Sequence, residues 1–144
     1  MALVWLAAMV QTGCTAKFIG DYDQSIDNGV SEVQQQAEVY FGKLKAEPNT
    51  PYDPNFYNQI NARMAALRTR AGVLPQYPII QKQIQELQGN LDRFQELDKI
   101  TPRPVPIGVV TAAETAITVN VESILKLELA LKRNTAPSLD EKNP

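Results

Sequence analysis

Residues 78–102 of the chain read PIIQKQIQELQGNLDRFQELDKITP. Apolar side chains recur in this stretch at spacings of three and four, which is the period of an α-helix with one buried face: Ile80, Ile84, Leu87, Leu91, Phe94 and Leu97. Pro78 suits the first turn of a helix, and Thr101-Pro102 ends the pattern. The stretch therefore predicts one amphipathic helix with its charged residues left to solvent.

Three further segments of the chain have the same helical period. Proline-containing stretches at residues 47–54, 72–78 and 101–106 separate the four segments, and none of them alternates with period two. The predicted buried stripes are Ile26, Val30, Val33, Ala37, Tyr40 and Leu44 in the first, Tyr57, Ile60, Met64, Leu67 and Ala71 in the second, and Ala113, Ile117, Val121, Ile124, Leu127 and Leu131 in the last. Short links favour antiparallel neighbours, so we expect an all-α, antiparallel up-down four-helix bundle over residues 21–133.

The predicted helix ends rest on capping chemistry. Asn28-Gly29 is a poor helix former, so the first helix is expected to begin at Ser31, with Gln34 completing a capping box. In the second helix Asp53 is the expected N-cap and Tyr52 is expected to pack on Tyr57.

The fourth segment is predicted to run from Thr111 to Arg133 and to be the most buried helix, because its apolar residues cover more than one stripe. Glu122 with Lys126 and Glu128 with Lys132 are expected to form i,i+4 pairs on it. The polar residues 134–144, with two prolines, are expected to be a disordered tail.

The start of the chain is typical of a processed membrane anchor. Residues 2–10 are uncharged and apolar, over a length that suits a secretory signal and is too short to span a bilayer. The stretch Val10-Gln11-Thr12-Gly13-Cys14 resembles a bacterial lipobox, in which the cysteine becomes the lipidated N-terminus. We therefore predict a signal segment at 1–13, lipidation of Cys14 and a tether over 14–20.

Two features of this start depart from the usual signal. Gln11 stands where leucine is common, and neither Lys nor Arg precedes the apolar run. The alternative is that residues 2–10 form a helix packed on the core while Cys14 stays a free thiol. Thr15 is not the aspartate that marks inner-membrane retention, so the expected location is the periplasmic side of the cell envelope, anchored in the outer membrane.

Composition excludes several classes of function. The net charge of −2 arises from 14 basic and 16 acidic residues spread along the chain, which disfavours nucleic acid as a partner. The sequence contains no histidine, and this removes most general-base, catalytic-triad and transition-metal arrangements. We predict no catalytic residue, no metal site and no cofactor, and hence a protein that is not an enzyme.

Two sets of residues in the sequence are candidate binding sites, and each has a simpler explanation. Asp21, Asp23, Ser25, Asp27 and Glu32 fall on ligand positions of an EF-hand-like loop, but Ile26 occupies the position that needs glycine. An acidic first turn at a helix N-terminus explains these residues better. Arg63 and Arg70 share one helix face and form a possible interaction face for an acidic partner or lipid head groups, although a solvated face is the simpler interpretation.

The region from Cys14 through Tyr22-Asp23-x-x-Ile26-Asp27 to Ile124-Leu125-Lys126-Leu127-Glu128-Leu129 resembles a group of small proteobacterial lipoproteins of unknown function. The resemblance implies an envelope location and a helical fold, and it implies no activity, cofactor or catalytic residue.

The sequence thus predicts a membrane-anchored lipoprotein that serves as an interaction or scaffolding module for another envelope protein or for its own copy. One alternative is a carrier or sensor of an apolar small molecule bound between helices, near Tyr57, Met64, Phe94 and Ile117. Another is a prophage-encoded envelope exclusion protein.

Overall fold

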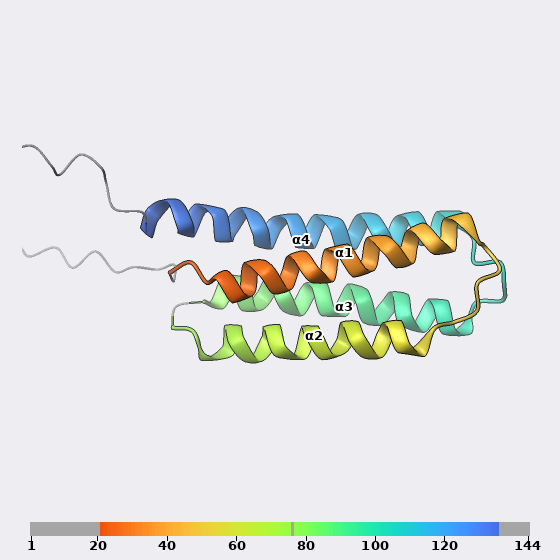
Figure 1. Ribbon diagram of the computed structural model, residues 1–144, viewed down its shortest axis with the longest axis horizontal. Helices are drawn as coiled ribbons and strands as arrows, with labels where there is room; N and C mark the ends of the chain where they lie inside the picture. The colour runs from red at the N-terminus through yellow and green to blue at the C-terminus, as the bar shows by residue number, and fades with distance from the viewer. Residues whose placement is uncertain (1–20, 76, 136–144) are drawn as a thin grey trace, which may run out of the picture.

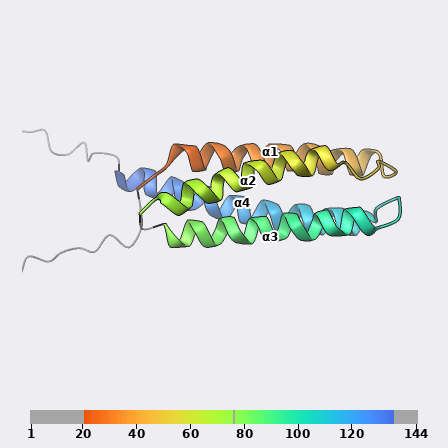
Figure 2. The same cartoon turned by 90° about the horizontal axis from the view of Figure 1, so that it is seen from below.

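The computed structural model describes residues 21–75 and 77–135 and contains four α-helices over that part of the chain: α1 (Gln24–Ala46), α2 (Pro54–Val73), α3 (Pro78–Ile100) and α4 (Ile107–Thr135). Consecutive helices run in opposite directions (Figures 1 and 2). Contacts join α1 to α2, α2 to α3, α3 to α4 and α4 to α1, which closes the bundle. The predicted all-α four-helix bundle is confirmed.

The predicted stripes form the core almost completely. All the predicted residues of α1 and α2 are at most 4% exposed, and so are those of α3 from Ile80 to Phe94. Leu97 is the exception in α3, because it is 44% exposed and the neighbouring Asp98 takes the inward position. On α4, Ala113 and Leu127 are half-buried and Glu128 lies inside, so the stripe there also continues through an acidic residue.

Helix α1 begins seven residues earlier than Ser31, so the predicted start is wrong. The Asp23 carboxylate accepts hydrogen bonds from the backbone amides of Ser25 and Ile26, which caps the helix at that point. Gly29 is tolerated inside the helix because the Leu67 side chain crosses it: an added Cβ would lie 2.7 Å from Leu67 Cδ2. Tertiary packing therefore outweighs the low helix propensity of Asn28-Gly29.

Helix α2 begins as predicted. The Asp53 carboxylate accepts from the amides of Asn55 and Phe56, and Pro54 occupies the first turn. The rings of Tyr52 and Tyr57 stack with their centroids 5.1 Å apart, which confirms the predicted contact across the helix start.

Helix α4 differs from its prediction at both ends. It begins at Ile107, because the amides of Val109 and Val110 bond to the Pro106 carbonyl, and it continues to Thr135, beyond the predicted end at Arg133. Val119 is 57% exposed and Leu129 is 47% exposed, so the prediction that α4 is the most buried helix is wrong. Of the two predicted pairs, Lys126 with Glu122 forms at 2.9 Å, whereas Glu128 is a core residue.

Over Ile107–Asn134, α4 has the length and apolar composition of a membrane-crossing helix, within the residues that the structure describes. A core helix of a bundle passes the same test, and Val110, Ile117, Val121 and Ile124 are all buried against the other helices. The predicted signal segment, Cys14, the tether and most of the predicted tail lie outside the described residues.

Candidate functional site

Hydrogen-bonded polar residues, most of them buried, gather at each end of the bundle, and the first group lies where the described chain enters it. We call Asp23, Arg70, Tyr77 and Glu128 the entry cluster; its members come from the start of α1, from α2, from the start of α3 and from α4. Arg70 donates to Asp23 Oδ2 from Nε at 3.0 Å and from Nη2 at 2.5 Å. The Asp23 backbone amide donates to Glu128 Oε2 at 3.0 Å. Asp23, at the start of α1, is thereby bonded to both α2 and α4.

Glu128 is completely buried, and its other oxygen lies 3.0 Å from the Tyr77 hydroxyl. The same hydroxyl lies 2.6 Å from the Asp21 carbonyl oxygen, so one phenolic proton faces two acceptors. A proton on Glu128 resolves this conflict, because Glu128 then donates to Tyr77 while Tyr77 donates to Asp21.

Burial raises the pKa of Glu128 and outweighs the hydrogen bonds from the Asp23 amide and the Tyr77 hydroxyl, which lower it; the nearby Asp23 and Asp27 carboxylates add to the rise. Burial also acts to raise the pKa of Asp23, but the hydrogen bonds from Arg70 and from two backbone amides outweigh it and lower that pKa. The entry cluster therefore contains one carboxyl whose pKa is raised and one whose pKa is lowered.

A second group, the distal cluster, lies at the opposite end and comprises Tyr40, Tyr57, Asp98 and Arg103. Asp98 Oδ2 accepts from the hydroxyls of Tyr40 at 2.6 Å and Tyr57 at 2.9 Å, and Oδ1 accepts from Arg103 Nη1 at 2.6 Å. Burial raises the pKa of both tyrosines, so both hydroxyls stay protonated and act as donors. The Asp98 side chain is fully enclosed, which suits a structural crosslink between α1, α2, α3 and the α3–α4 loop.

The buried positions of Asp98 and Glu128 were not predicted from the sequence. A signal for both exists, because each stands four residues after a core residue, Phe94 or Ile124, and thus on a buried stripe. Leu97 and Leu127 directly precede these two residues and were predicted as the core residues instead, since leucine is buried more often than aspartate or glutamate.

The predicted face of Arg63 and Arg70 is occupied by contacts within the chain. Arg63 donates to Glu32 and Arg70 to Asp23, so both guanidiniums join α2 to acidic residues of the first helix and its cap. The EF-hand-like stretch is not a loop, because α1 begins at Gln24 and buries Ile26. Among the described residues, aspartate and glutamate side chains form no group of three or more that could hold a metal ion.

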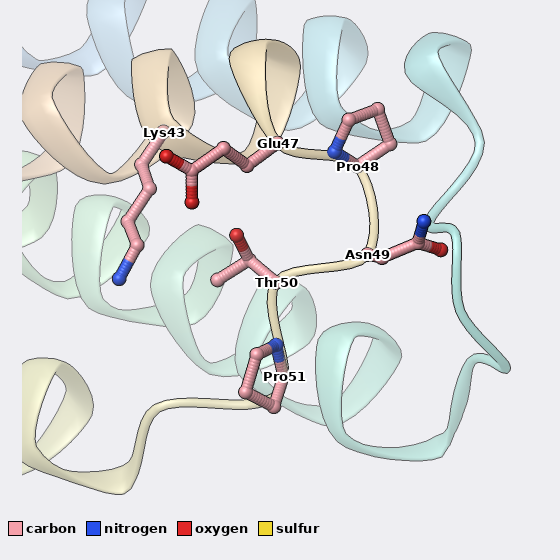
Figure 3. Close-up of a pocket in the computed structure, with 6 residues that line it drawn as sticks. All are labelled: Lys43, Glu47, Pro48, Asn49, Thr50 and Pro51. Atoms are coloured by element: carbon pink, nitrogen blue, oxygen red, sulfur yellow. The ribbon is translucent and has the colours of Figure 1, made fainter.

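The residues named for an apolar ligand, Tyr57, Met64, Phe94 and Ile117, all belong to the continuous core and are at most 2% exposed. None of these four residues lines the surface hollows found among the described residues. One of them, the distal hollow, lies where α1 passes into the α1–α2 loop (Figure 3), has a volume of about 400 Å³ and is lined by Lys43, Glu47, Pro48, Asn49, Thr50 and Pro51.

Comparison of the chain with models of protein families, with curated proteins and with solved structures found no match.

Proposed function

We propose that the protein is a lipid-anchored component of the bacterial cell envelope whose four-helix bundle is a non-enzymatic interaction or scaffolding module. The observation that carries the proposal is the lipobox-like Val10-Gln11-Thr12-Gly13-Cys14, which holds the only cysteine of the chain. Attachment at Cys14 through two or more acyl chains gives a durable anchor. The resemblance to small proteobacterial lipoproteins points the same way.

The bundle suits such an anchored role. Because Asp23 is bonded to Arg70 of α2 and to Glu128 of α4, a pull on the chain before α1 is shared by several helices. An α-helix as long as α1, 23 residues, measures about 35 Å. An anchor that precedes α1 leaves the α1–α2 and α3–α4 loops at the far end of the bundle (Figure 1).

Exposed apolar side chains at this far end support contact with another protein. Ile100 ends α3 and Ile107 begins α4, and they are 63% and 61% exposed. Because these residues flank the α3–α4 loop, they offer apolar surface to a partner at this end of the bundle.

Mass spectrometry of the protein purified from membranes tests the anchor. We expect a chain that begins at Cys14 and carries acyl groups, and we expect the Cys14→Ser variant to keep its leader and to leave the membrane fraction more readily. A wild-type chain that retains Met1 and has a free Cys14 thiol would disprove the anchor.

Affinity capture from membranes, with wild-type and Cys14→Ser proteins compared, tests the scaffolding role. The expected result is a defined envelope protein, or a second copy of the chain, that is captured with the anchored form. A protein that is lipidated but captures neither would contradict the scaffolding role and leave the anchor standing.

A further inference from the structure

The outward face of α4 carries more apolar surface than the core of the bundle uses. Helix α4 packs on α1 and α3, and its remaining face lies along one edge of the bundle (Figure 1). The most apolar stretch of 18 residues in this helix is only 22% buried. Val119 and Leu129 both lie on the outward face and are exposed. A single exposed apolar residue is ordinary, so the residues between these two decide what the face can bind.

Val119, Glu122, Lys126 and Leu129 form one exposed row, which we call the outer stripe of α4. Successive members are three, four and three residues apart, which puts them on one side of the helix, as in the seam of a coiled coil. Lys126 pairs with Glu122 at 2.9 Å. The outer stripe therefore has an acidic and a basic residue at its centre and one large apolar residue at either end.

The outer stripe is complementary to a second copy of itself that runs in the opposite direction. When Glu122 of one copy lies opposite Lys126 of the other, the two-fold symmetry also places Val119 opposite Leu129. A parallel pairing would instead place Glu122 opposite Glu122 and Lys126 opposite Lys126, and like charges across an interface repel. The charges and the apolar residues therefore both favour the antiparallel arrangement. The residues beside the stripe add no repulsion, because they are uncharged: Thr118, Ser123, Leu125 and Ala130.

The exposed ion pair on α3 provides a comparison within the same molecule. Lys82 and Glu86 also stand four residues apart, and they pair at 4.0 Å. The same antiparallel arrangement around this pair would place Ile79 opposite Gly89, which has no side chain to pack against it. The two apolar ends thus distinguish the outer stripe of α4 from an ordinary surface ion pair.

We propose that two copies of the chain form a two-fold dimer through the outer stripes of their α4 helices, in antiparallel orientation. Glu122 of each copy pairs with Lys126 of the other, and Val119 packs against Leu129 on both sides of this centre. One helix from each copy makes a smaller contact than the ~20 to 30 residues per side of a standard interface, so we expect a dissociation constant in the micromolar range.

The dimer deepens the proposed interaction role, because it names a second copy as one partner, and it does not depend on the lipid anchor. The outer stripe leaves Ile100 and Ile107 outside the contact, so the far end of each bundle stays available to another protein. Two anchors in one membrane are compatible with the dimer, because helices that lie along the membrane surface keep both entry ends at the same height.

Disulfide crosslinking of the full-length chain tests the antiparallel register. Val119→Cys and Leu129→Cys are made separately in the Cys14→Ser chain, so that each form has one thiol. We expect a disulfide-linked dimer when the two forms are mixed and oxidised, and little when either form is oxidised alone. Two copies of residue 119 would lie about 15 Å apart along the helix axis, which is beyond the reach of a disulfide.

Two outcomes of this experiment would overturn the dimer. Self-crosslinking as fast as mixed crosslinking indicates random collision or a parallel pairing. An absence of crosslinking in every sample means that a second copy does not cover the outer stripe, as when residues 2–10 of the same chain pack on it. Either result leaves the capture of a different envelope protein unaffected, so the failure of this inference is distinguishable from the failure of the proposed function.

Charge reversal gives a second test in the same assay. Glu122→Lys, added to both cysteine forms, should slow mixed crosslinking about tenfold or more, because it places like charges opposite each other. Adding Lys126→Glu as well should restore the rate. Glu86→Lys, the matched control on α3, should have no effect, and circular dichroism should show the same helix content in all these variants. A double reversal that stays slow, or a control that slows equally, would contradict the pairing of Glu122 with Lys126 between copies.

Discussion

Gly29 and Gly42 both lie inside α1, but only Gly29 is packed against another side chain. An added Cβ at Gly29 would meet Leu67 Cδ2 at 2.7 Å, whereas at Gly42 it would meet nothing within 4 Å. Alanine gains about 1 kcal/mol over glycine in a helix, and overpacking a core contact costs about 1 to 3 kcal/mol.

We therefore expect Gly42→Ala to raise the free energy of unfolding by about 0.5 to 1 kcal/mol and Gly29→Ala to lower it by about 1 kcal/mol. Urea unfolding followed by circular dichroism measures both. Equal stabilisation by the two substitutions would mean that Leu67 yields freely and that α1 and α2 pack loosely there.

Asp98 is buried and the adjacent Leu97 is exposed, which is the reverse of what a charged and an apolar side chain favour. Asp98→Ala should lower the free energy of unfolding by about 3 to 5 kcal/mol, because it leaves Tyr40, Tyr57 and Arg103 without their shared acceptor. Leu97→Gln, the matched control on the adjacent residue, should change it by about 0.5 kcal/mol or less, since Leu97 is 44% exposed. Thermal or urea unfolding of the two variants decides the matter, and a larger loss for Leu97→Gln would place the leucine in the core.

The sequence predicts most of the apolar core residues, although not Phe41 or Val110, and it misses the polar ones. Hydrophobic period identifies Ile80 or Val121 from sequence alone, because burial of an apolar side chain needs no particular partner. Burial of Asp98 needs Tyr40, Tyr57 and Arg103, which come from three other parts of the chain. Such a coincidence is visible only after the helices have been packed.

Local capping residues determine where α2 begins, whereas contacts with other helices determine where α1 begins. Asp53-Pro54 marks the start of α2 by itself, and the structure agrees. The start of α1 depends on Asp23, whose cap is reinforced by Arg70 of α2 and Glu128 of α4. Residues 24–30 are therefore helical despite a sequence that favours a later start.

The junction between α1 and α4 should respond to pH through Glu128. Its pKa is raised in the folded protein, so the folded state binds the proton more tightly than the unfolded chain does. Glu128 thus favours folding increasingly as the pH falls through its folded pKa toward the unfolded value of about 4.3. Asp23 has the opposite sign: its pKa is lowered, and its contribution is lost at still lower pH.

We expect Glu128→Gln to flatten the part of the stability curve, above the unfolded glutamate pKa of about 4.3, in which the wild type becomes more stable as the pH falls, since glutamine is neutral throughout. Urea unfolding of wild type and variant at several pH values measures this difference. Glu122→Gln, on an exposed pair with Lys126, is the control and should leave that part of the curve unchanged. Parallel curves for wild type and Glu128→Gln would show that Glu128 does not titrate there.

At the scale of the whole molecule, the two ends of the bundle differ in what they expose. At the entry end, Val73 closes α2 and is 70% exposed. At the far end, Ile100 and Ile107 flank one loop, and the distal hollow lies in the other. An anchor before α1 would hold Val73 near the membrane and leave Ile100 and Ile107 free for a partner.

This asymmetry predicts which apolar residues carry the proposed interaction. The double variant Ile100→Gln and Ile107→Gln should unfold at the same urea concentration as wild type within error, because both side chains are largely exposed. It should nevertheless lose most of the protein captured by crosslinking on intact cells. Val73→Gln removes a similar apolar surface from the entry end and should capture as wild type does. If Val73→Gln abolishes capture and the double variant does not, the partner binds at the membrane-proximal end, and the far end of the bundle has another role.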